Sequence, residues 1–178
     1  MNQEFNTRTL TKMALLVALC CVSAYIAFPL PFTPGMVSAI TLAMDLAAFL
    51  LTPKQTFFTM LTYTLLGAVG LPVFTGGFGG MAKILGPTGG FIFAFMVAYP
   101  AISYFKGKEP NFKRYALAAI FVGIPITYVG GVAGIMIVMD LNLWEGLVMS
   151  AFPFIPGDIM KALAAAYLGV KLNRALER

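Results

Sequence analysis

Long apolar runs dominate the chain and are separated by short segments rich in polar residues, proline or glycine. A helix of about 20 apolar residues can cross the hydrocarbon core of a bilayer. Proline interrupts such runs because it lacks the N–H donor that a helix interior requires. The pattern predicts membrane-spanning helices at about residues 10–28, 36–51, 56–71, 86–105, 115–139 and 157–176, with a surface helix around 144–151.

The composition agrees with this interpretation. Hydrophobic residues make up 60% of the 178 residues and charged residues only 11%, which is too little polar surface to cover a water-soluble globule. We therefore expect an all-α integral membrane protein, a bundle of six transmembrane helices. With six crossings and short loops, residues 1–178 form a single transmembrane domain and leave no room for a second one.

The basic residues predict the orientation of the bundle, because short basic loops stay on the cytoplasmic side. With both termini cytoplasmic in the cell membrane, ten of the twelve basic residues lie on that side: Arg8, Lys12, Lys54, Lys106, Lys108, Lys113, Arg114, Lys171, Arg174 and Arg178. Lys83 then faces outside and Lys161 lies within a span. The net charge of +5 follows from this topology, so no nucleic-acid partner is expected.

Nine of the 18 glycines lie between Gly67 and Gly90. Such a segment has irregular backbone, which at membrane depth is tolerated only beside protein or a water-filled cavity. It is either part of a ligand site at the outer mouth or a flexible outer loop. It is not a phosphate-binding Walker loop, because the nearest candidate, Gly107-Lys108, continues into Glu109.

Asp158 and Lys161 stand three residues apart at the start of the last span and share one helix face. Ionisable residues inside a membrane are costly and mark functional sites by default. The pair would offer a carboxylate acceptor and an ammonium donor to a ligand. The alternative is a helix N-cap with an internal ion pair. Asp45 is a weaker candidate, interpreted as reaching the cytoplasmic interface near Lys54.

Other features carry less information. Five aromatic side chains are candidates for an apolar pocket or for ordinary core and interface positions: Tyr63, Phe74, Phe78, Phe91 and Trp144. Ala14 with Ala18, and Gly130 with Gly134, have the spacing that lets helices approach closely. The chain has no histidine, and neither a metal cluster nor a nucleophile-base pair is apparent. An enzyme, a metal site and catalytic residues are therefore not expected.

Three motifs together resemble the BioY family, the biotin-specific substrate-binding (S) subunits of energy-coupling-factor (ECF) transporters. These are Tyr63-x-Leu-Leu-Gly-Ala-Val-Gly-Leu-Pro-Val-Phe74, the glycine pairs Gly79-Gly80 and Gly86-Pro-Thr-Gly-Gly90, and Pro153-Phe-Ile-Pro-Gly-Asp158-Ile-Met-Lys161. The likeness covers nearly the whole chain, including the proline-rich turn at Pro29 to Pro34. The chain departs from the family pattern at Val37 to Thr41, where a threonine-leucine-glutamine motif is more usual.

The resemblance implies a subunit that binds biotin near its outer face, with biotin as cargo and no cofactor. Its implied partners are a transmembrane coupling subunit and two ATPase subunits, with Ala14 and Ala18 forming the face that docks the coupling subunit. We expect the ligand contacts to come from Asp158, Lys161, Lys83, Phe74, Thr88, Gly89 and Gly90. Asp158 would accept from the ureido N–H groups, and Lys161 would meet either the ureido carbonyl or the carboxylate. Lys83 is a second candidate for the carboxylate. Another small vitamin as ligand, or a structural membrane protein without ligand, remain alternatives.

Overall fold

The computed structural model describes residues 5–176 as a bundle of helices with one short hairpin. The helices are α1 (Thr7–Ser23), α2 (Ile40–Leu50), α3 (Pro53–Ala68), α4 (Met81–Leu85), α5 (Gly89–Phe105), α6 (Phe112–Ala118), α7 (Ile124–Met139), α8 (Leu143–Ser150) and α9 (Ile155–Leu176). A π-helical turn, η2 (Ala119–Gly123), joins α6 to α7, and strands β1 (Ala27–Pro29) and β2 (Met36–Ser38) lie between α1 and α2.

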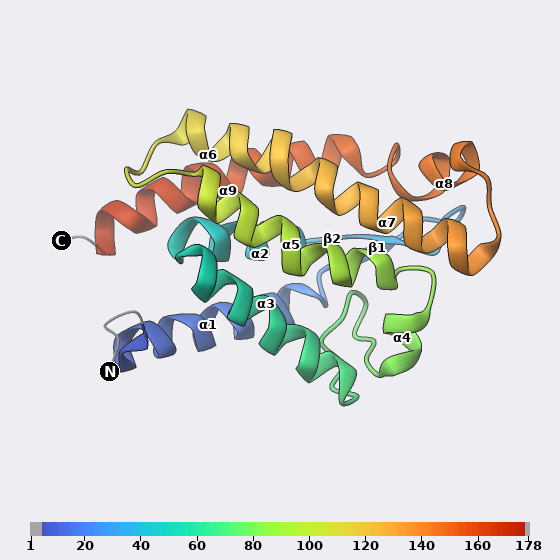
Figure 1. Ribbon diagram of the computed structural model, residues 1–178, viewed down its shortest axis with the longest axis horizontal. Coiled ribbons are helices and arrows are strands. Elements are labelled where there is room, and N and C mark those ends of the chain that lie inside the picture. Colours follow the sequence, from blue (N-terminus) through green and yellow to red (C-terminus); the bar gives the residue numbers. More distant parts are fainter. Residues whose placement is uncertain (1–4, 177–178) are drawn as a thin grey trace.

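The long helices run along the longest axis of the molecule, and the connections gather at its two ends (Figure 1). The start of α1, the α2–α3 turn, the α5–α6 connection and the end of α9 lie at one end. The hairpin tip, α4 and α8 lie at the other. The first group of segments carries the basic residues predicted to be cytoplasmic, except Arg178, which falls outside the described residues.

The first two helices are shorter than predicted, because a hairpin lies between them. The predicted helix at 10–28 ends at Ser23, and the one predicted to start at residue 36 begins at Ile40. Between them, Ala27, Phe28 and Pro29 pair antiparallel with Ser38, Val37 and Met36. Prolines between the two strands exclude helix but tolerate extended backbone at a sheet edge, so an otherwise helical chain acquires two three-residue strands.

The other predicted elements lie close to their expected ranges. The fifth span is continuous from Phe112 to Met139 but contains the π-helical turn immediately before Pro125. Proline cannot donate a backbone hydrogen bond and clashes with the preceding turn, which accounts for the widened backbone there. Pro100 lies inside α5. The predicted surface helix corresponds to α8.

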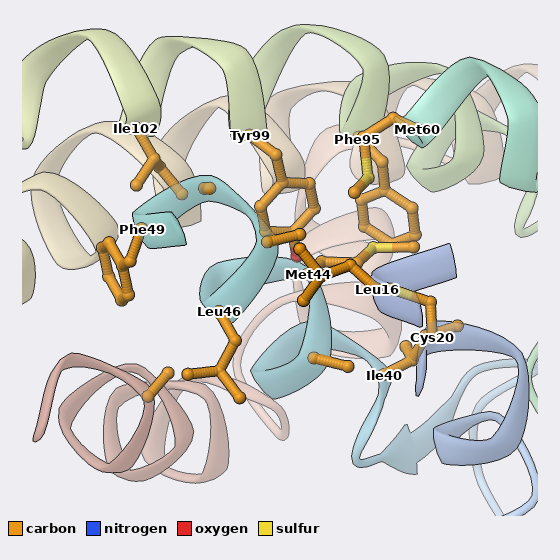
Figure 2. Close-up of a cluster of buried hydrophobic side chains, with 14 of the residues drawn as sticks. Leu16, Cys20, Ile40, Met44, Leu46, Phe49, Met60, Phe95, Tyr99 and Ile102 are labelled. Carbon is orange, nitrogen blue, oxygen red and sulfur yellow. The ribbon is translucent and has the colours of Figure 1, made fainter. Parts of the chain in front are cut away.

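Helix α2 forms the centre of the bundle, where it packs against α1, α3, α5 and α9. Its apolar side chains point in all directions, as expected of a helix buried on every side. Figure 2 shows Met44, Leu46 and Phe49 of α2 among side chains from neighbouring helices. A row of small residues on α9 permits the close approach of α2: Ala162, Ala165, Ala166 and Gly169, all buried.

Polar side chains satisfy the carbonyl groups at the C-terminal end of α2, which lack partners within their own helix. Lys106 donates from Nζ to the carbonyl oxygens of Ala48 (2.8 Å) and Phe49 (2.7 Å). Asn173 donates to the Phe49 oxygen at 3.0 Å, and Ser103 to the Leu51 oxygen at 2.6 Å. These bonds hold the C-terminal end of α2 against both α5 and α9.

The outer surface of the bundle is apolar. Large hydrophobic side chains such as Phe121, Val129 and Ile137 are exposed, Ile137 to 81%. Contiguous apolar surface of this kind indicates a lipid environment. Within residues 5–176, one helix, Phe112–Met139, is by itself long and apolar enough to cross a bilayer, and α8 with α9 would qualify only as a pair bent by 49°. Helices α2 and α5 are apolar but shorter, so helix length alone does not establish six crossings.

Candidate binding site

A cavity of about 100 Å³ opens among the hairpin, the glycine-rich segment and helices α2, α3, α5, α7 and α9. Its lining is mostly apolar and aromatic, with a few polar groups, which is the usual character of a small-molecule site. Five of the seven predicted ligand-binding residues line this cavity: Asp158, Lys161, Phe74, Thr88 and Lys83.

Asp158 is the centre of the polar wall. Its Oδ1 lies 2.6 Å from Lys161 Nζ, and the side chains of Asp158 and Lys161 are only 14% and 16% exposed. Tyr128 from α7 donates its hydroxyl to Oδ2 at 2.6 Å, and Thr41 from α2 donates to Oδ1 at 3.4 Å. Three helices therefore orient one carboxylate, and these charge-assisted hydrogen bonds are stronger than neutral ones.

Lys161 connects this wall to the hairpin. Besides its ion pair with Asp158, its Nζ donates to the Ser38 carbonyl oxygen at 2.9 Å. Asp158 and Lys161 lie in the first two turns of α9, so they point from the same face into the cavity. The ion pair of the alternative interpretation is present, but both of its residues also line the cavity, as the ligand-site interpretation requires.

The glycine-rich segment forms another wall of the cavity. Phe74, which is 2% exposed, packs edge-on against Tyr63 with ring centroids 5.7 Å apart. Tyr63 donates its hydroxyl to the Val73 carbonyl oxygen at 2.9 Å. Residues 74 and 78 pair through backbone hydrogen bonds, and Gly76 donates its N–H to the carbonyl oxygen of Ala24 at the end of α1. The segment is therefore tied to α1 as well as to α3.

Lys83 extends from α4, a short helix between the spans, into the lining of the cavity. Its Nζ lies 4.8 Å from the centre of the Phe78 ring. Burial lowers the pKa of the Lys83 ammonium below its ordinary value, because leaving water disfavours the charged form. A ligand carboxylate at this end of the cavity would offset that cost by supplying the opposite charge.

Gly89 and Gly90 have a different role from the one predicted. They were expected to bring backbone to the ligand, but neither lines the cavity. A side chain at Gly89 would collide with the Ile84 carbonyl oxygen, and one at Gly90 with the Gly130 carbonyl oxygen. These glycines therefore allow α5 to start beside α4 and to pack closely on α7. Gly76 and Gly77, with φ of 81° and 75°, supply the turn that a side chain would strain.

The aromatic predictions divide in a similar way. Tyr63, Phe74 and Phe91 line the cavity, whereas Phe78 and Trp144 are absent from its lining. Trp144 is 68% exposed and packs against Phe152. The sequence interpretation missed the contribution of Tyr128, Thr41 and the hairpin. The position of Tyr128 in the interior of the apolar run at 115–139 was a signal for its role, since a tyrosine hydroxyl requires a partner when buried.

Asp45 does not reach the cytoplasmic interface as predicted. It lies in the middle of α2, is 6% exposed, and lines a smaller cavity together with Asp158. The prediction was wrong because α2 is packed against α1, α3, α5 and α9, which places Asp45 deep among other helices. No group of three or more His, Cys, Asp or Glu side chains in residues 5–176 is arranged to hold a metal ion.

Ala14 and Ala18 are exposed on α1, whereas Met13, Leu16, Val17 and Cys20 face the core. The alanine pair therefore does not pack within the described part of the chain. In contrast, Gly130 and Gly134 are used internally, against Gly90 of α5. The two small-residue motifs that look alike in the sequence thus have opposite environments.

Comparison with known proteins agrees with this geometry. The biotin transporter BioY2 of Lactococcus lactis subsp. cremoris (strain MG1363) is 36% identical over 174 residues, which cover 98% of this chain and 94% of that protein. The biotin transporter BioY of Thermotoga maritima is 32% identical over 167 residues, 94% of this chain and 96% of that protein.

Solved structures share the fold. The S-component for biotin from an ECF-type ABC transporter, a crystal structure at 2.1 Å, superposes with a TM-score of 0.89 at 26% identity, covering 98% of this chain and 95% of that one. The S component of a bacterial ECF transporter gives 0.61 at 18% identity, covering 96% and 95%, which supports the fold alone. The profile of the BioY family matches residues 1–178, and on this evidence the chain belongs to the BioY family.

Proposed function

We propose that this chain is the biotin-binding S subunit of an ECF-type importer, which captures biotin at the outer face of the cell membrane. The observation that carries the proposal is the Asp158–Lys161 pair in a mostly apolar cavity of a BioY family member. The chain is a transport subunit and not an enzyme. Biotin is its cargo, and no cofactor is required.

The chemistry of biotin fits the two ends of the cavity. Its ureido ring presents two N–H donors and one carbonyl acceptor, and its valerate chain ends in a carboxylate. Asp158 accepts from the ureido N–H groups, and Lys161 donates to the ureido carbonyl or to the carboxylate. Lys83 is the second cation within the cavity lining and meets the carboxylate if Lys161 does not. Phe74 and Thr88 complete the walls around the rings and the chain of the ligand.

The fold and the basic residues support one membrane arrangement. Six crossings are formed by α1, α2, α3, α5, the continuous α6–α7 helix and α9, with both termini in the cytoplasm and residues 1–178 as one domain. The α4 end of the bundle then faces outside, where the cavity opens, and the basic segments face inside in accord with the positive-inside rule.

Transport requires partners, since no Walker loop occurs in the sequence. The partners are a transmembrane coupling subunit and two ATPase subunits. Ala14 and Ala18 supply a face of α1 on which another helix can pack closely, because both are exposed and small.

Isothermal titration of the purified protein with biotin and a panel of other vitamins tests this function. We expect saturable binding of biotin alone, and biotin that co-purifies with protein from cells. Tight binding of a different vitamin would reassign the cargo within the same class. Absence of any saturable ligand would contradict the transport function and favour a structural membrane protein.

The glycine-rich segment is expected to act as a lid that becomes ordered when biotin occupies the cavity. Glycine loses more backbone freedom on ordering than other residues, so closure depends on contacts made with the ligand. Hydrogen exchange across residues 73–90 should therefore slow on addition of biotin, whereas exchange in the cytoplasmic loop at 106–114 should not change. Equal exchange in the lid with and without saturating biotin would show a passive loop.

A further inference from the structure

Asp45 is a buried carboxyl group that the proposed biotin site does not use. It is 6% exposed in the middle of α2, and it makes no hydrogen bond or ion pair with any residue of the described range 5–176. Tyr99 and Thr127, 3% and 8% exposed, likewise have unpaired hydroxyl groups within that range. Buried polar groups almost always have a partner, so three such groups together require an explanation.

All three groups line one small cavity. It has a volume of about 20 Å³ and is also lined by Thr41, Tyr128 and Asp158. No fully enclosed side-chain polar atom within residues 5–176 lacks a partner, so the unpaired oxygens face the open space of this cavity. Figure 2 shows Tyr99 pointing from α5 toward α2, the helix that carries Asp45.

The volume and lining match the requirements of one water molecule. A buried water needs roughly 10–15 Å³ and two to four polar partners. Four lining residues, Thr41, Thr127, Tyr128 and Asp158, belong to both this cavity and the larger one. The small cavity therefore lies directly behind the polar wall of the biotin site.

The charges around Asp45 favour its neutral acid form. The ionisable groups that line the same small cavity are Asp158 of α9, Tyr99 of α5 and Tyr128 of α7. Lys161 is already engaged by Asp158 and by the Ser38 carbonyl oxygen. If Asp45 were ionised, its carboxylate would be buried without a cation of its own and close to the Asp158 carboxylate, which is unfavourable.

We propose that an ordered water molecule occupies this small cavity and joins Asp45, as a neutral acid, to Tyr99 and to the Tyr128–Asp158 pair. Asp45 is then a positioning residue: through the water it holds the Asp158 carboxylate in the orientation that meets the ligand. This role rests on the proposed biotin-binding function, whereas the water and the neutral acid do not.

Substitutions separate a polar role from a charged one. Asp45→Asn keeps a donor and an acceptor, so its biotin affinity should stay within about twofold of the wild type. Asp45→Leu keeps the branching at Cγ, with methyl groups in place of the oxygens, but removes the polar partner, and should weaken binding roughly fivefold or more. Because Tyr99→Phe removes another partner of the same water, the double variant with Asp45→Leu should bind no more weakly than Asp45→Leu alone.

Met44→Leu is the matched control, because Met44 is a buried residue of the same helix that lines neither cavity. It should bind like the wild type. An equal loss in Asp45→Asn and Asp45→Leu would overturn the proposal, as would unchanged affinity in Asp45→Leu. A biotin affinity that rises with sodium chloride but not with choline chloride would indicate a bound cation in place of the water, and would also overturn the proposal.

Two measurements need no biotin and keep failure of the inference distinct from failure of the function. The infrared carbonyl band of a protonated carboxylic acid should be present in the wild type and lost in Asp45→Asn. A crystal structure should show density for one water between Asp45 and Tyr99. If the wild type binds no biotin yet shows both signals, the biotin function fails and the water site stands. Absence of the infrared band or of the density for the water overturns the water site.

Discussion

Replacing Asp158 by asparagine is expected to weaken biotin binding by at least roughly thirtyfold, the largest loss of any single polar substitution in the cavity. The neutral amide cannot form an ion pair with Lys161, and it offers the ligand a weaker acceptor than a carboxylate does. Tyr128 would also lose its charged partner, which it now contacts at 2.6 Å. Isothermal titration of both purified proteins measures the difference directly.

Asp45→Asn is the control for this experiment, since it makes the same chemical change in a buried aspartate outside the larger cavity. We expect it to bind biotin much more tightly than Asp158→Asn does. Circular dichroism and size-exclusion elution should show both variants folded. Equal affinities in the two folded variants would show that Asp158 is not a ligand contact.

Replacing Ala14 or Ala18 by tryptophan is expected to abolish assembly with the coupling subunit, and with it ATP-driven uptake, while leaving biotin binding near normal. Both alanines are exposed on α1 and lie on the opposite side from its core-facing residues. A bulky indole would prevent the close helix approach that small residues permit. Affinity pull-down of the complex and biotin titration of the isolated subunit measure the two effects separately.

Val129→Trp on α7 provides the matched control, because Val129 is also exposed on a long helix, to 72%. It should neither disturb the isolated subunit nor prevent assembly. Recovery of the full complex from both alanine variants would show that this face of α1 faces only lipid. Loss of the complex in Val129→Trp as well would indicate that bulky surface residues act nonspecifically.

The sequence was most informative where a single physical rule dominates. Long apolar runs predict helices, and the basic segments that separate them lie at one end of the bundle. Asp158 and Lys161 were found because ionisable residues inside an apolar run are costly and conspicuous. Exposure of Ala14 and Ala18 is consistent with the docking role that the family resemblance implied, which itself stays a prediction.

The remaining features depend on tertiary contacts that spacing does not reveal. Gly90 is required by the close approach of α7, which the sequence does not show. Asp45 was predicted at an interface because its helix is shorter and more central than the apolar run suggested. The segment Val37 to Thr41, which joins β2 to α2 and departs from the family pattern, nevertheless contributes the Ser38 carbonyl and the Thr41 hydroxyl to the polar wall.

The hydrogen bond from Lys161 to the Ser38 carbonyl has a consequence for selectivity. Together with the bonds that Asp158 receives, it gives both Asp158 and Lys161 partners within the protein itself. An arriving molecule competes with the protein's own groups for both side chains. A molecule with only donors can replace the partners of Asp158 but not those of Lys161, and a molecule with only acceptors does the reverse, so one charge is left with fewer hydrogen bonds. A cyclic urea has both donors and an acceptor and can replace the partners of both side chains. We therefore expect near-analogues of biotin to be rejected through this internal competition as well as through the shape of the cavity.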